Sequence, residues 1–178
     1  MLYNKAMTNK EIYIIVAVDS KNGIGKDNAM PWHFKKETKY FKEITLTTKD
    51  PSKKNMVIMG KNTWYSLPEK YRPLKNRKNV VLTRDISLKI EGVEIRQSLD
   101  EAINSAGDDI ETIFIIGGAT LFKESLTHPR LTGLYITFIE NEYECDTYFP
   151  KIPAKFSHKQ LLKEEEEDGV KFKFILYT

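Results

Sequence analysis

A glycine pair, Gly117-Gly118, separates an apolar stretch at 113–116 from an amphipathic stretch that begins near Ala119. Glycines at the end of a strand allow the backbone to approach a phosphate closely. The start of a following helix offers free N–H groups and a partial positive charge, which suit the same anion. Glycines also relieve crowding at ordinary strand-to-helix turns, so the pair alone leaves open a phosphate site or a structural turn.

Two basic side chains follow other apolar stretches. Lys61 comes after the stretch 56–59 and a glycine, and Arg84 comes shortly after the stretch 80–82. In an open parallel sheet, ligands bind outside the carboxyl ends of the strands. Two cations beyond the glycine pair would suit an additional phosphate, as on a phosphorylated dinucleotide. On spacing alone an ordinary surface is favoured, because the chain has 28 lysines and arginines.

The segment 23–32 contains two glycines, an asparagine and a proline, together with the large apolar side chains of Met30 and Trp32. A loop with hinges and exposed apolar groups could close over a flat ligand as a lid. A structural loop pinned by a buried tryptophan explains the same residues, so both interpretations remain open.

Glu37 lies three residues before Tyr40 and four before Phe41, a spacing that places all three on one side of a helix. A carboxylate that faces a pocket is costly unless it is paired, and it becomes useful when a ligand offers a charge or paired donors. Neighbouring lysines in the same segment make a surface glutamate the interpretation that periodicity alone favours.

The elements that would position these residues alternate along the chain. Apolar stretches typical of buried strands are separated by segments with helical periodicity, and Ser98 with Glu101 has the form of a capping box. This alternation predicts crossover connections and a largely parallel sheet covered on both faces. The predicted strands are 12–18, 56–59, 80–82 and 113–116, and the predicted helices are 34–44, 98–106 and 119–126.

The two ends of the chain have different patterns. Residues 156–163 and 170–177 flank Asp168-Gly169, which predicts an antiparallel hairpin whose second strand has the half-buried alternation of an outer strand. The acidic run 164–168 is interpreted as a solvated turn at this hairpin, without a ligand. Residues 1–10 are predicted to form a flexible extension.

Composition excludes several classes of protein. The chain has 178 residues, of which 40% are hydrophobic and 30% charged, as in a single globular domain. No apolar run approaches the roughly 20 residues of a membrane span, and the absence of a secretory signal together with the single Cys145 favours a cytoplasmic protein. The net charge of +3 does not indicate nucleic acid, and the scattered His33, His128 and His158 do not indicate a metal site.

Taken together, these residues resemble the dihydrofolate reductase family, in uninterrupted order from Ile12 to Tyr177. The resemblance rests on Ile15-Val16-Ala17-Val18, Gly23-Ile24-Gly25, Met30-Pro31-Trp32, Val57-Ile58-Met59-Gly60-Lys61-Asn62-Thr63-Trp64, Arg72-Pro73-Leu74, Arg77-Lys78-Asn79, Ile116-Gly117-Gly118 and Asp146-Thr147-Tyr148-Phe149-Pro150. It implies an α/β domain over residues 11–178, with a mostly parallel eight-stranded sheet, an antiparallel C-terminal strand and about four flanking helices.

The activity that the resemblance implies is reduction of 7,8-dihydrofolate to 5,6,7,8-tetrahydrofolate by hydride transfer from NADPH. Dihydrofolate and antifolate inhibitors are the implied partners, and the implied enzyme is a monomer. Glu37 matches the family's active-site carboxylate, which accepts a ring N–H and an exocyclic amine of the pterin side by side. Thr137 matches a threonine that hydrogen-bonds this carboxylate. Trp32 is expected to hold an ordered water, and the proton is expected to enter as water under the loop that carries Met30.

Further roles are implied residue by residue. Arg77 matches the arginine that forks onto the α-carboxylate of the glutamate tail, a pairing that lysine makes poorly. Lys61 and Arg84 match the cations on the 2′-phosphate, and the Gly117-Gly118 bond is expected to be cis. The remaining substrate-binding positions are Ile15, Val16, Phe41, Leu67, Leu74 and Ile116. The remaining cofactor-binding positions are Ala17, Gly23, Ile24, Gly25, Lys26, Asp27, Asn28, Ala29, Asn62, Thr63, Thr83, Asp85, Ala119, Thr120, Leu121, Phe122 and Glu124.

The chain departs from the pattern of some or most family members at Thr38, Gln97 and Ala119, and its acid is Glu37 where bacterial members commonly have Asp. Thr38 stands where an apolar residue usually touches the folate, and Gln97 stands where some members have an arginine near the adenine. Two alternatives to a dihydrofolate reductase remain open. A related-fold reductase of a ribosylamino-pyrimidine would share the NADPH site without needing Glu37 or Arg77, and a non-catalytic nucleotide-binding module would need neither.

Overall fold

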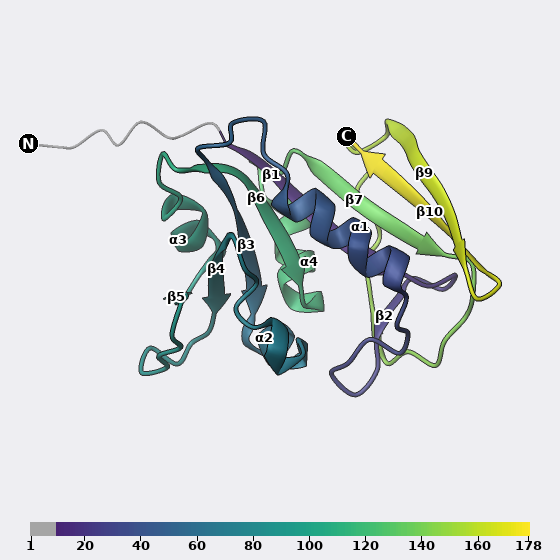
Figure 1. The fold of residues 1–178 in the computed structure, drawn as a ribbon, viewed down its shortest axis with the longest axis horizontal. Helices are drawn as coiled ribbons and strands as arrows, with labels where there is room; N and C mark the ends of the chain where they lie inside the picture. Colours follow the sequence, from purple (N-terminus) through teal and green to yellow (C-terminus); the bar gives the residue numbers. More distant parts are fainter. Residues whose placement is uncertain (1–9) are drawn as a thin grey trace, which may run out of the picture.

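The computed structural model describes residues 10–178, which form an eight-stranded sheet flanked by helices (Figure 1). The strand order is β5-β4-β3-β6-β1-β7-β10-β9. The strands of this sheet are β1 (Glu11–Val18), β3 (Lys54–Gly60), β4 (Arg77–Leu82), β5 (Val93–Arg96), β6 (Ile110–Gly117), β7 (Gly133–Ile139), β9 (Lys159–Glu167) and β10 (Val170–Tyr177). A separate two-stranded ladder joins β2 (Gly23–Gly25) to β8 (Thr147–Tyr148).

The first six strands of that order, β5 to β7, pair in parallel, and β10 runs antiparallel to both of its neighbours, β7 and β9. The helices are α1 (Lys35–Leu46), α2 (Lys61–Ser66), α3 (Leu99–Asn104) and α4 (Ala119–Thr127), with a short 3₁₀ turn at Glu69–Tyr71. This arrangement confirms the fold expected from the sequence.

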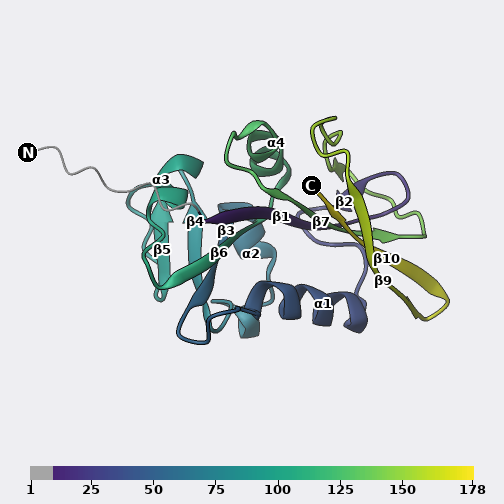
Figure 2. The same ribbon diagram turned by 90° about the horizontal axis from the view of Figure 1, so that it is seen from above.

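The helices form layers on the two faces of the sheet, with α1 on one face and α3 and α4 on the other (Figure 2). Side chains of successive strand residues alternate between these faces. Ile14 and Val16 of β1 pack into the core that contains Leu99 of α3 and Leu121 of α4. Ile15, between them, packs on the opposite face, the one covered by α1.

Aromatic contacts seat α1 on the antiparallel end of the sheet. The ring of Phe34, just before the helix, lies 4.7 Å from that of Phe172. The ring of Tyr40 lies 4.0 Å from that of Phe174, which is two residues after Phe172 on β10. All four side chains are buried, so these pairs fix the start of α1 against β10.

Several sequence predictions are confirmed and two are wrong: the acidic run 164–168 is mostly strand and not turn, and 170–177 is not an outer strand. Ser98 caps α3, its Oγ accepting from the N–H of Glu101, although the Glu101 carboxylate accepts from Gln97 and not from Ser98. The C-terminal hairpin turns at Asp168-Gly169, where both residues have positive φ, and most of the acidic run belongs to β9. The expectation that 170–177 is an outer strand is wrong, because β9 covers β10 and forms the edge itself.

The sequence analysis did not identify β5 or β7. Strand β7 lies between β1 and β10, and it pairs in parallel with β1 and antiparallel with β10. The predicted flexible extension, 1–10, lies outside the described residues except for Lys10, whose ammonium donates to the carbonyl of Ile110. None of the helices within residues 10–178 has the length and apolar character that a membrane span requires.

Asn55, on β3, ties the end of α1 to the sheet. Its amide nitrogen donates to the carbonyls of Thr45 and Thr47, at 3.0 and 2.9 Å, and its amide oxygen accepts from the N–H of Thr112 at 3.2 Å. The side chain is fully buried. Three backbone groups at this junction therefore depend on one side chain for their hydrogen bonds.

We expect Asn55→Ala to lower the free energy of unfolding by about 2–4 kcal/mol, because it leaves buried donors and acceptors without partners. Denaturant unfolding followed by circular dichroism measures the change. Lys42→Ala, an exposed substitution on α1, is the control and should change stability by less than about 0.5 kcal/mol. Equal stability of the two variants would contradict the role assigned to Asn55.

Candidate active site

Glu37 lies in the first turn of α1 and is buried, with 8% of its surface exposed. Within residues 10–178 its carboxylate forms no hydrogen bond or ion pair. Burial alone raises its pKa from the ordinary value of 4.5 to about 7. The interpretation of Glu37 as a surface residue, which periodicity favoured, is wrong. A buried acid without a protein partner is suited to a ligand that brings its own donors.

The sheet beneath α1 contributes three predicted site residues to the same face as Glu37. Ala17 of β1 and Thr137 of β7 are paired in register, and Thr137 is buried. The alternation of β7 places Thr137 on the face of Tyr135 and Ile139, which pack on the α1 side. Ile15 also faces this side. Val16 packs into the opposite core, so only its backbone is available here.

Two buried polar atoms near the start of α1 have no hydrogen-bond partner among the described residues. They are the indole nitrogen of Trp32 and the hydroxyl oxygen of Tyr40. Burial raises the pKa of Tyr40, and the neighbouring Tyr135 and Glu37 raise it further. Tyr40 therefore lies within electrostatic reach of Glu37. Buried donors of this kind are normally satisfied by water or a ligand, which fits the water expected at Trp32.

The predicted apolar wall and tail-binding arginine lie beside this face. Phe41 and Leu67, both half-buried, pack on the cluster that contains the buried Leu74. Arg77, at the start of β4, donates to the Thr45 hydroxyl at 2.8 Å and to the Lys75 carbonyl at 3.2 Å. Burial lowers the pKa of Arg77. Within residues 10–178 no carboxylate pairs with its guanidinium, which remains available to an anionic group.

The glycine pair stands at the carboxyl end of β6, and its peptide bond is cis, as expected. A Cβ on Gly117 or Gly118 would lie 3.2 or 3.3 Å from the hydroxyl of Thr63, so side chains here would crowd α2. Gly118 is the N-cap of α4 and Gly60 is the N-cap of α2. Neither helix start has a side-chain cap or an acidic residue in its first turn, a combination that fits a bound phosphate.

The predicted phosphate cations lie at the ends of β3 and β4. Hydrogen bonds from Ser87 lower the pKa of Asp85, and the charge of Lys61 lowers it further, so Lys61 and the 83–85 segment are neighbours. Arg84 is exposed, and within residues 10–178 its side chain forms no hydrogen bond or ion pair.

The other predicted cofactor residues fall into two groups. Exposed or half-exposed side chains that a cofactor could reach are Lys26, Asp27, Asn28, Ala29, Asn62, Thr63, Thr83, Ala119, Thr120 and Glu124. The side chains of Leu121 and Phe122 are buried in the core on the α4 face of the sheet, so α4 can offer a cofactor only their backbone.

The loop that carries Met30 is held at its base by Asp19, a residue that the sequence analysis missed. The buried Asp19 carboxylate accepts from the N–H groups of Lys21 and Gly23, and also from that of Tyr143 after β7. Burial alone would raise the pKa of Asp19, but the backbone hydrogen bonds outweigh it and leave the pKa below its ordinary value. An aspartate directly after a buried strand and before a glycine loop was the available signal.

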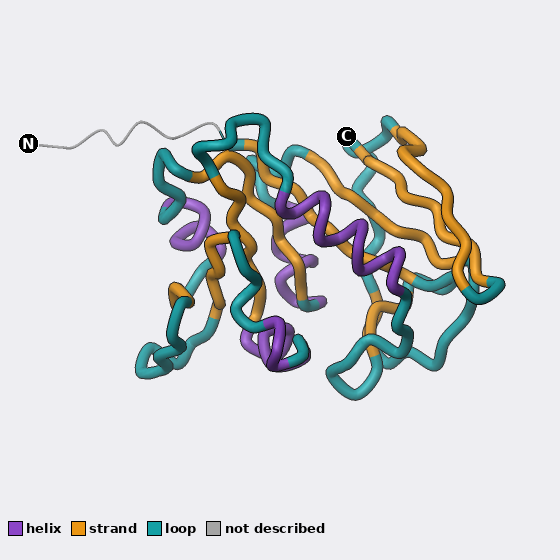
Figure 3. Tube along the Cα trace, viewed as in Figure 1, coloured by secondary structure: helices purple, strands orange, loops and turns teal. Residues whose placement is uncertain are grey.

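Close packing reinforces this attachment of the loop, which Figure 3 draws in teal on both sides of the short orange strand β2. A Cβ on Gly23 would lie 2.6 Å from the Cβ of Cys145, which leaves room only for glycine. The N–H of Asp27 donates to the carboxylate of Asp146, and Asp146 in turn donates its N–H to Gly25. Met30 itself is 48% exposed, as a lid residue would be without ligand contacts.

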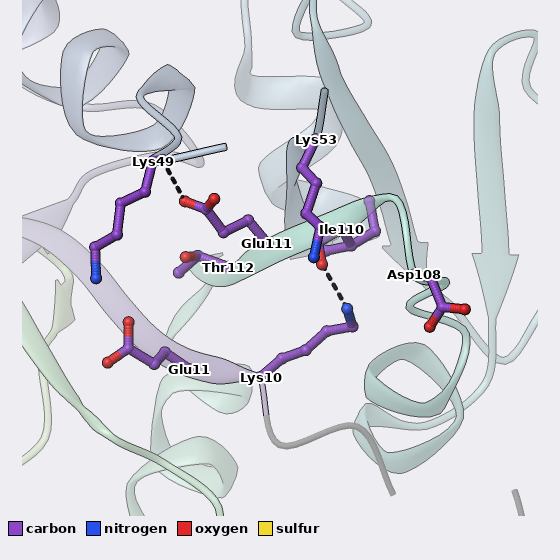
Figure 4. Close-up of a pocket in the computed structure, with 8 residues that line it drawn as sticks. All are labelled: Lys10, Glu11, Lys49, Lys53, Asp108, Ile110, Glu111 and Thr112. Carbon is purple, nitrogen blue, oxygen red and sulfur yellow. Dashed lines mark hydrogen bonds between the residues drawn. The ribbon is translucent and has the colours of Figure 1, made fainter. Parts of the chain in front are cut away.

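A cavity of about 470 Å³ lies elsewhere, at the amino ends of β1 and β6 (Figure 4). Its lining mixes the ammonium groups of three lysines with three carboxylates; it comprises Lys10, Glu11, Lys49, Lys53, Asp108, Ile110, Glu111 and Thr112. This is the end of the sheet opposite to Glu37 and the glycine pair, so the cavity is not part of the candidate site. Among residues 10–178 no cluster of His, Cys, Asp and Glu has an arrangement that could hold a metal ion.

The pKa of Glu37 predicts a pH-dependent cost to folding. Between pH 4.5 and about 7 the unfolded chain ionises this acid while the folded chain keeps its proton, so stability falls as pH rises. We therefore expect Glu37→Gln to raise the free energy of unfolding by about 2–3 kcal/mol at pH 8, with the gain vanishing below pH 4.5. Urea unfolding at several pH values tests this, with Glu43→Gln on the exposed side of α1 as control. A less stable Glu37→Gln protein at pH 8 would contradict the buried environment.

Comparison with known proteins identifies the family. The model of the family described as Dihydrofolate reductase matches residues 11–178. A dihydrofolate reductase from Heliothis virescens is 40% identical over 171 residues, covering 93% of this chain and 91% of that protein. The Sus scrofa dihydrofolate reductase is 39% identical over 178 residues, with coverages of 92% and 95%. The solved structure of Schistosoma mansoni dihydrofolate reductase has a TM-score of 0.82 at 36% identity, covering 94% of this chain and 97% of that one. This chain therefore belongs to the dihydrofolate reductase family of oxidoreductases.

Proposed function

We propose that this protein catalyses the NADPH-dependent reduction of 7,8-dihydrofolate to 5,6,7,8-tetrahydrofolate, a reaction that supports one-carbon metabolism and thymidylate synthesis. The observation that carries the proposal is Glu37, a buried carboxylate without a partner among the described residues. It lies on the face of the sheet that also bears Ile15, Ala17 and Thr137. Membership of the family supplies the reaction class.

Glu37 binds and orients the substrate in this proposal. Its two oxygens accept the ring N–H and the adjacent exocyclic amine of the pterin, which fixes the plane of the ring. In this structure Thr137 makes no hydrogen bond to Glu37, and we expect its hydroxyl to donate to the carboxylate when the substrate is bound. The backbone carbonyls of Ile15 and Ile116 line another edge of the ring. Hydrogen bonds from the ligand donors offset the cost of desolvating the Glu37 carboxylate, so the ionised form of Glu37 is favoured once substrate is bound.

The remainder of the substrate extends past Phe41, Leu67 and Leu74. The guanidinium of Arg77, already fixed by Thr45 and Lys75, binds the α-carboxylate of the glutamate tail with a forked pair of hydrogen bonds. Diaminopyrimidine antifolates present the same paired donors as the pterin, and we expect them to compete with dihydrofolate for Glu37.

The residues at the ends of β3, β4 and β6 fit NADPH. The glycines at 60, 117 and 118 let backbone approach the pyrophosphate, and the uncapped start of α4 offers N–H groups to it. Lys61 and Arg84 bind the 2′-phosphate and select NADPH over NADH. When bound, NADPH supplies the hydride that the pterin ring accepts.

A proton must also reach the pterin nitrogen next to the carbon that receives the hydride. In the proposal a water molecule, held by the indole N–H of Trp32 under the loop that carries Met30, supplies it. Asp19 and Asp146 attach that loop to the loop after β7, so it can exclude bulk water while Met30 covers the ligand. We further propose that the enzyme acts as a cytoplasmic monomer without nucleic-acid partners, in keeping with its single cysteine and small net charge.

Oxidation of NADPH on addition of dihydrofolate, followed by absorbance, tests the proposed reaction. We expect Glu37→Gln to lower kcat/KM for dihydrofolate by at least about 100-fold, while NADPH binding measured by fluorescence changes less than about twofold. Glu37→Asp should recover part of the activity, and Glu43→Gln should behave as the unsubstituted protein. Full activity in Glu37→Gln, or no dihydrofolate-dependent oxidation at all, would refute the proposal.

Selection between the two dinucleotides tests the phosphate site. The double variant Lys61→Ala/Arg84→Ala should reduce the ratio of kcat/KM for NADPH to that for NADH by at least about tenfold, because each lost charge-assisted contact weakens only the phosphorylated cofactor. Lys42→Ala/Lys89→Ala removes the same charge from exposed positions and should leave the ratio unchanged. A preference that survives the first double variant would place the 2′-phosphate elsewhere.

A further inference from the structure

Helix α1 begins without a cap of its own. The N-cap position is Phe34, whose side chain cannot accept a hydrogen bond, yet the first N–H groups of any helix lack partners inside the helix. Glu167, at the end of β9, takes over this role. Its carboxylate accepts from the N–H of Lys35 at 2.9 Å through Oε1 and from the N–H of Lys36 at 2.8 Å through Oε2.

The same hairpin holds α1 by further contacts. The ammonium of Lys36 pairs with the Glu165 carboxylate at 3.0 Å and donates to the carbonyl of Glu166 at 2.8 Å. Hydrogen bonds from the N–H groups of Lys36 and Lys35 lower the pKa of Glu167, so this acid is charged at neutral pH. A charged carboxylate at a helix start also interacts favourably with the helix dipole.

The capped turn is the one that carries the substrate-binding acid. Glu37 directly follows Lys36, so the two backbone groups held by Glu167 immediately precede it. Glu37 has no hydrogen bond of its own to fix its direction among the described residues, and its orientation therefore depends on the backbone of this turn. Bidentate acceptance by Glu167 restrains that backbone from a distant part of the chain.

We propose that Glu167 is a positioning residue for dihydrofolate binding, because it holds the first turn of α1 so that the carboxylate of Glu37 meets the pterin donors. This inference rests on the proposed function. Glu167 belongs to the acidic run 164–168, which the sequence suggested to be a solvated turn. In this inference it contributes to the affinity for substrate. The expected defect is selective for the pterin, since the proposed NADPH residues lie on other elements.

The test compares Glu167→Ala and Glu167→Gln with Glu166→Ala. The Glu166 side chain is exposed and makes no hydrogen bond or ion pair with the described residues, so Glu166→Ala removes a charge from the same tip without removing a contact. Steady-state kinetics at saturating NADPH give KM and kcat for dihydrofolate, fluorescence titration gives the NADPH affinity, and deuterium exchange reports protection of the N–H groups at 35 and 36.

We expect Glu167→Ala to raise KM for dihydrofolate by roughly fivefold to tenfold, with kcat and NADPH affinity changed less than about twofold. Protection at 35 and 36 should fall in parallel. Glu167→Gln, which keeps one acceptor oxygen, should give an intermediate KM, and it also serves if the alanine variant does not fold. Glu166→Ala should match the unsubstituted protein.

Two results would overturn the inference. One is a KM in both Glu167 variants equal to that of Glu166→Ala, even if their melting temperatures are lower, because a purely structural cap would act in that way. The other is an equal loss of dihydrofolate and NADPH affinity, which would indicate general loosening. Failure of the proposed function is distinguishable, because either the unsubstituted protein would then show no dihydrofolate-dependent oxidation of NADPH or Glu37→Gln would retain full activity, whatever the Glu167 variants do.

Discussion

The burial of one unpaired carboxylate is the constraint on which this structure depends. Desolvation of Glu37 opposes folding, and within residues 10–178 no cation or hydrogen-bond donor compensates for it. The surrounding elements must therefore hold α1 against the sheet by other means. Aromatic pairs to β10, the amide of Asn55 and the carboxylate of Glu167 do so at successive points along the helix. Contacts elsewhere on α1 thus keep the Glu37 carboxylate buried, although the carboxylate has no partner of its own among the described residues.

The parallel sheet brings the proposed cofactor residues together. Strands β3, β4 and β6 are neighbours and run in parallel. The segments near positions 60, 84 and 117, which follow their carboxyl ends, therefore lie close together although they are far apart in the sequence. Glycine at that edge removes the side chains that would fill the space between α2 and α4. The antiparallel end of the sheet has a different role, since β7 and β10 form the surface on which α1, with the proposed substrate-binding acid, packs. The proposed sites for the two ligands therefore lie on two regions of a single sheet.

Much of this arrangement was predictable from the sequence, and the exceptions have physical reasons. Buried strands such as 12–18 and 113–116 are apolar over their whole length, and the Ser98 cap is a local signal, so both could be recognised. The position of Glu37 could not be derived from periodicity, because neighbouring lysines mask the buried side of its helix; only the resemblance to a known family indicated it. The contacts of Asp19 with Tyr143 and of Glu167 with the start of α1 join residues more than 100 positions apart. Asp19 has a local signal, an aspartate between a buried strand and a glycine loop, but no local pattern indicates either distant partner. The position of β10 in the sheet was misjudged because the alternation of a strand does not show whether another strand pairs with its outer side.

The cap that Glu167 places on α1 joins positions about 130 residues apart in a chain of 178. During synthesis the amino-terminal part of the chain emerges first, and helix α1 leaves the ribosome long before β9 and β10 exist. Until the final hairpin has been translated and docked, the turn that carries the acid lacks its cap and the aromatic partners at 172 and 174. Chains interrupted before that point lack these contacts to the turn that carries Glu37. In the proposed function, substrate recognition therefore has to wait until β9 and β10 have been made.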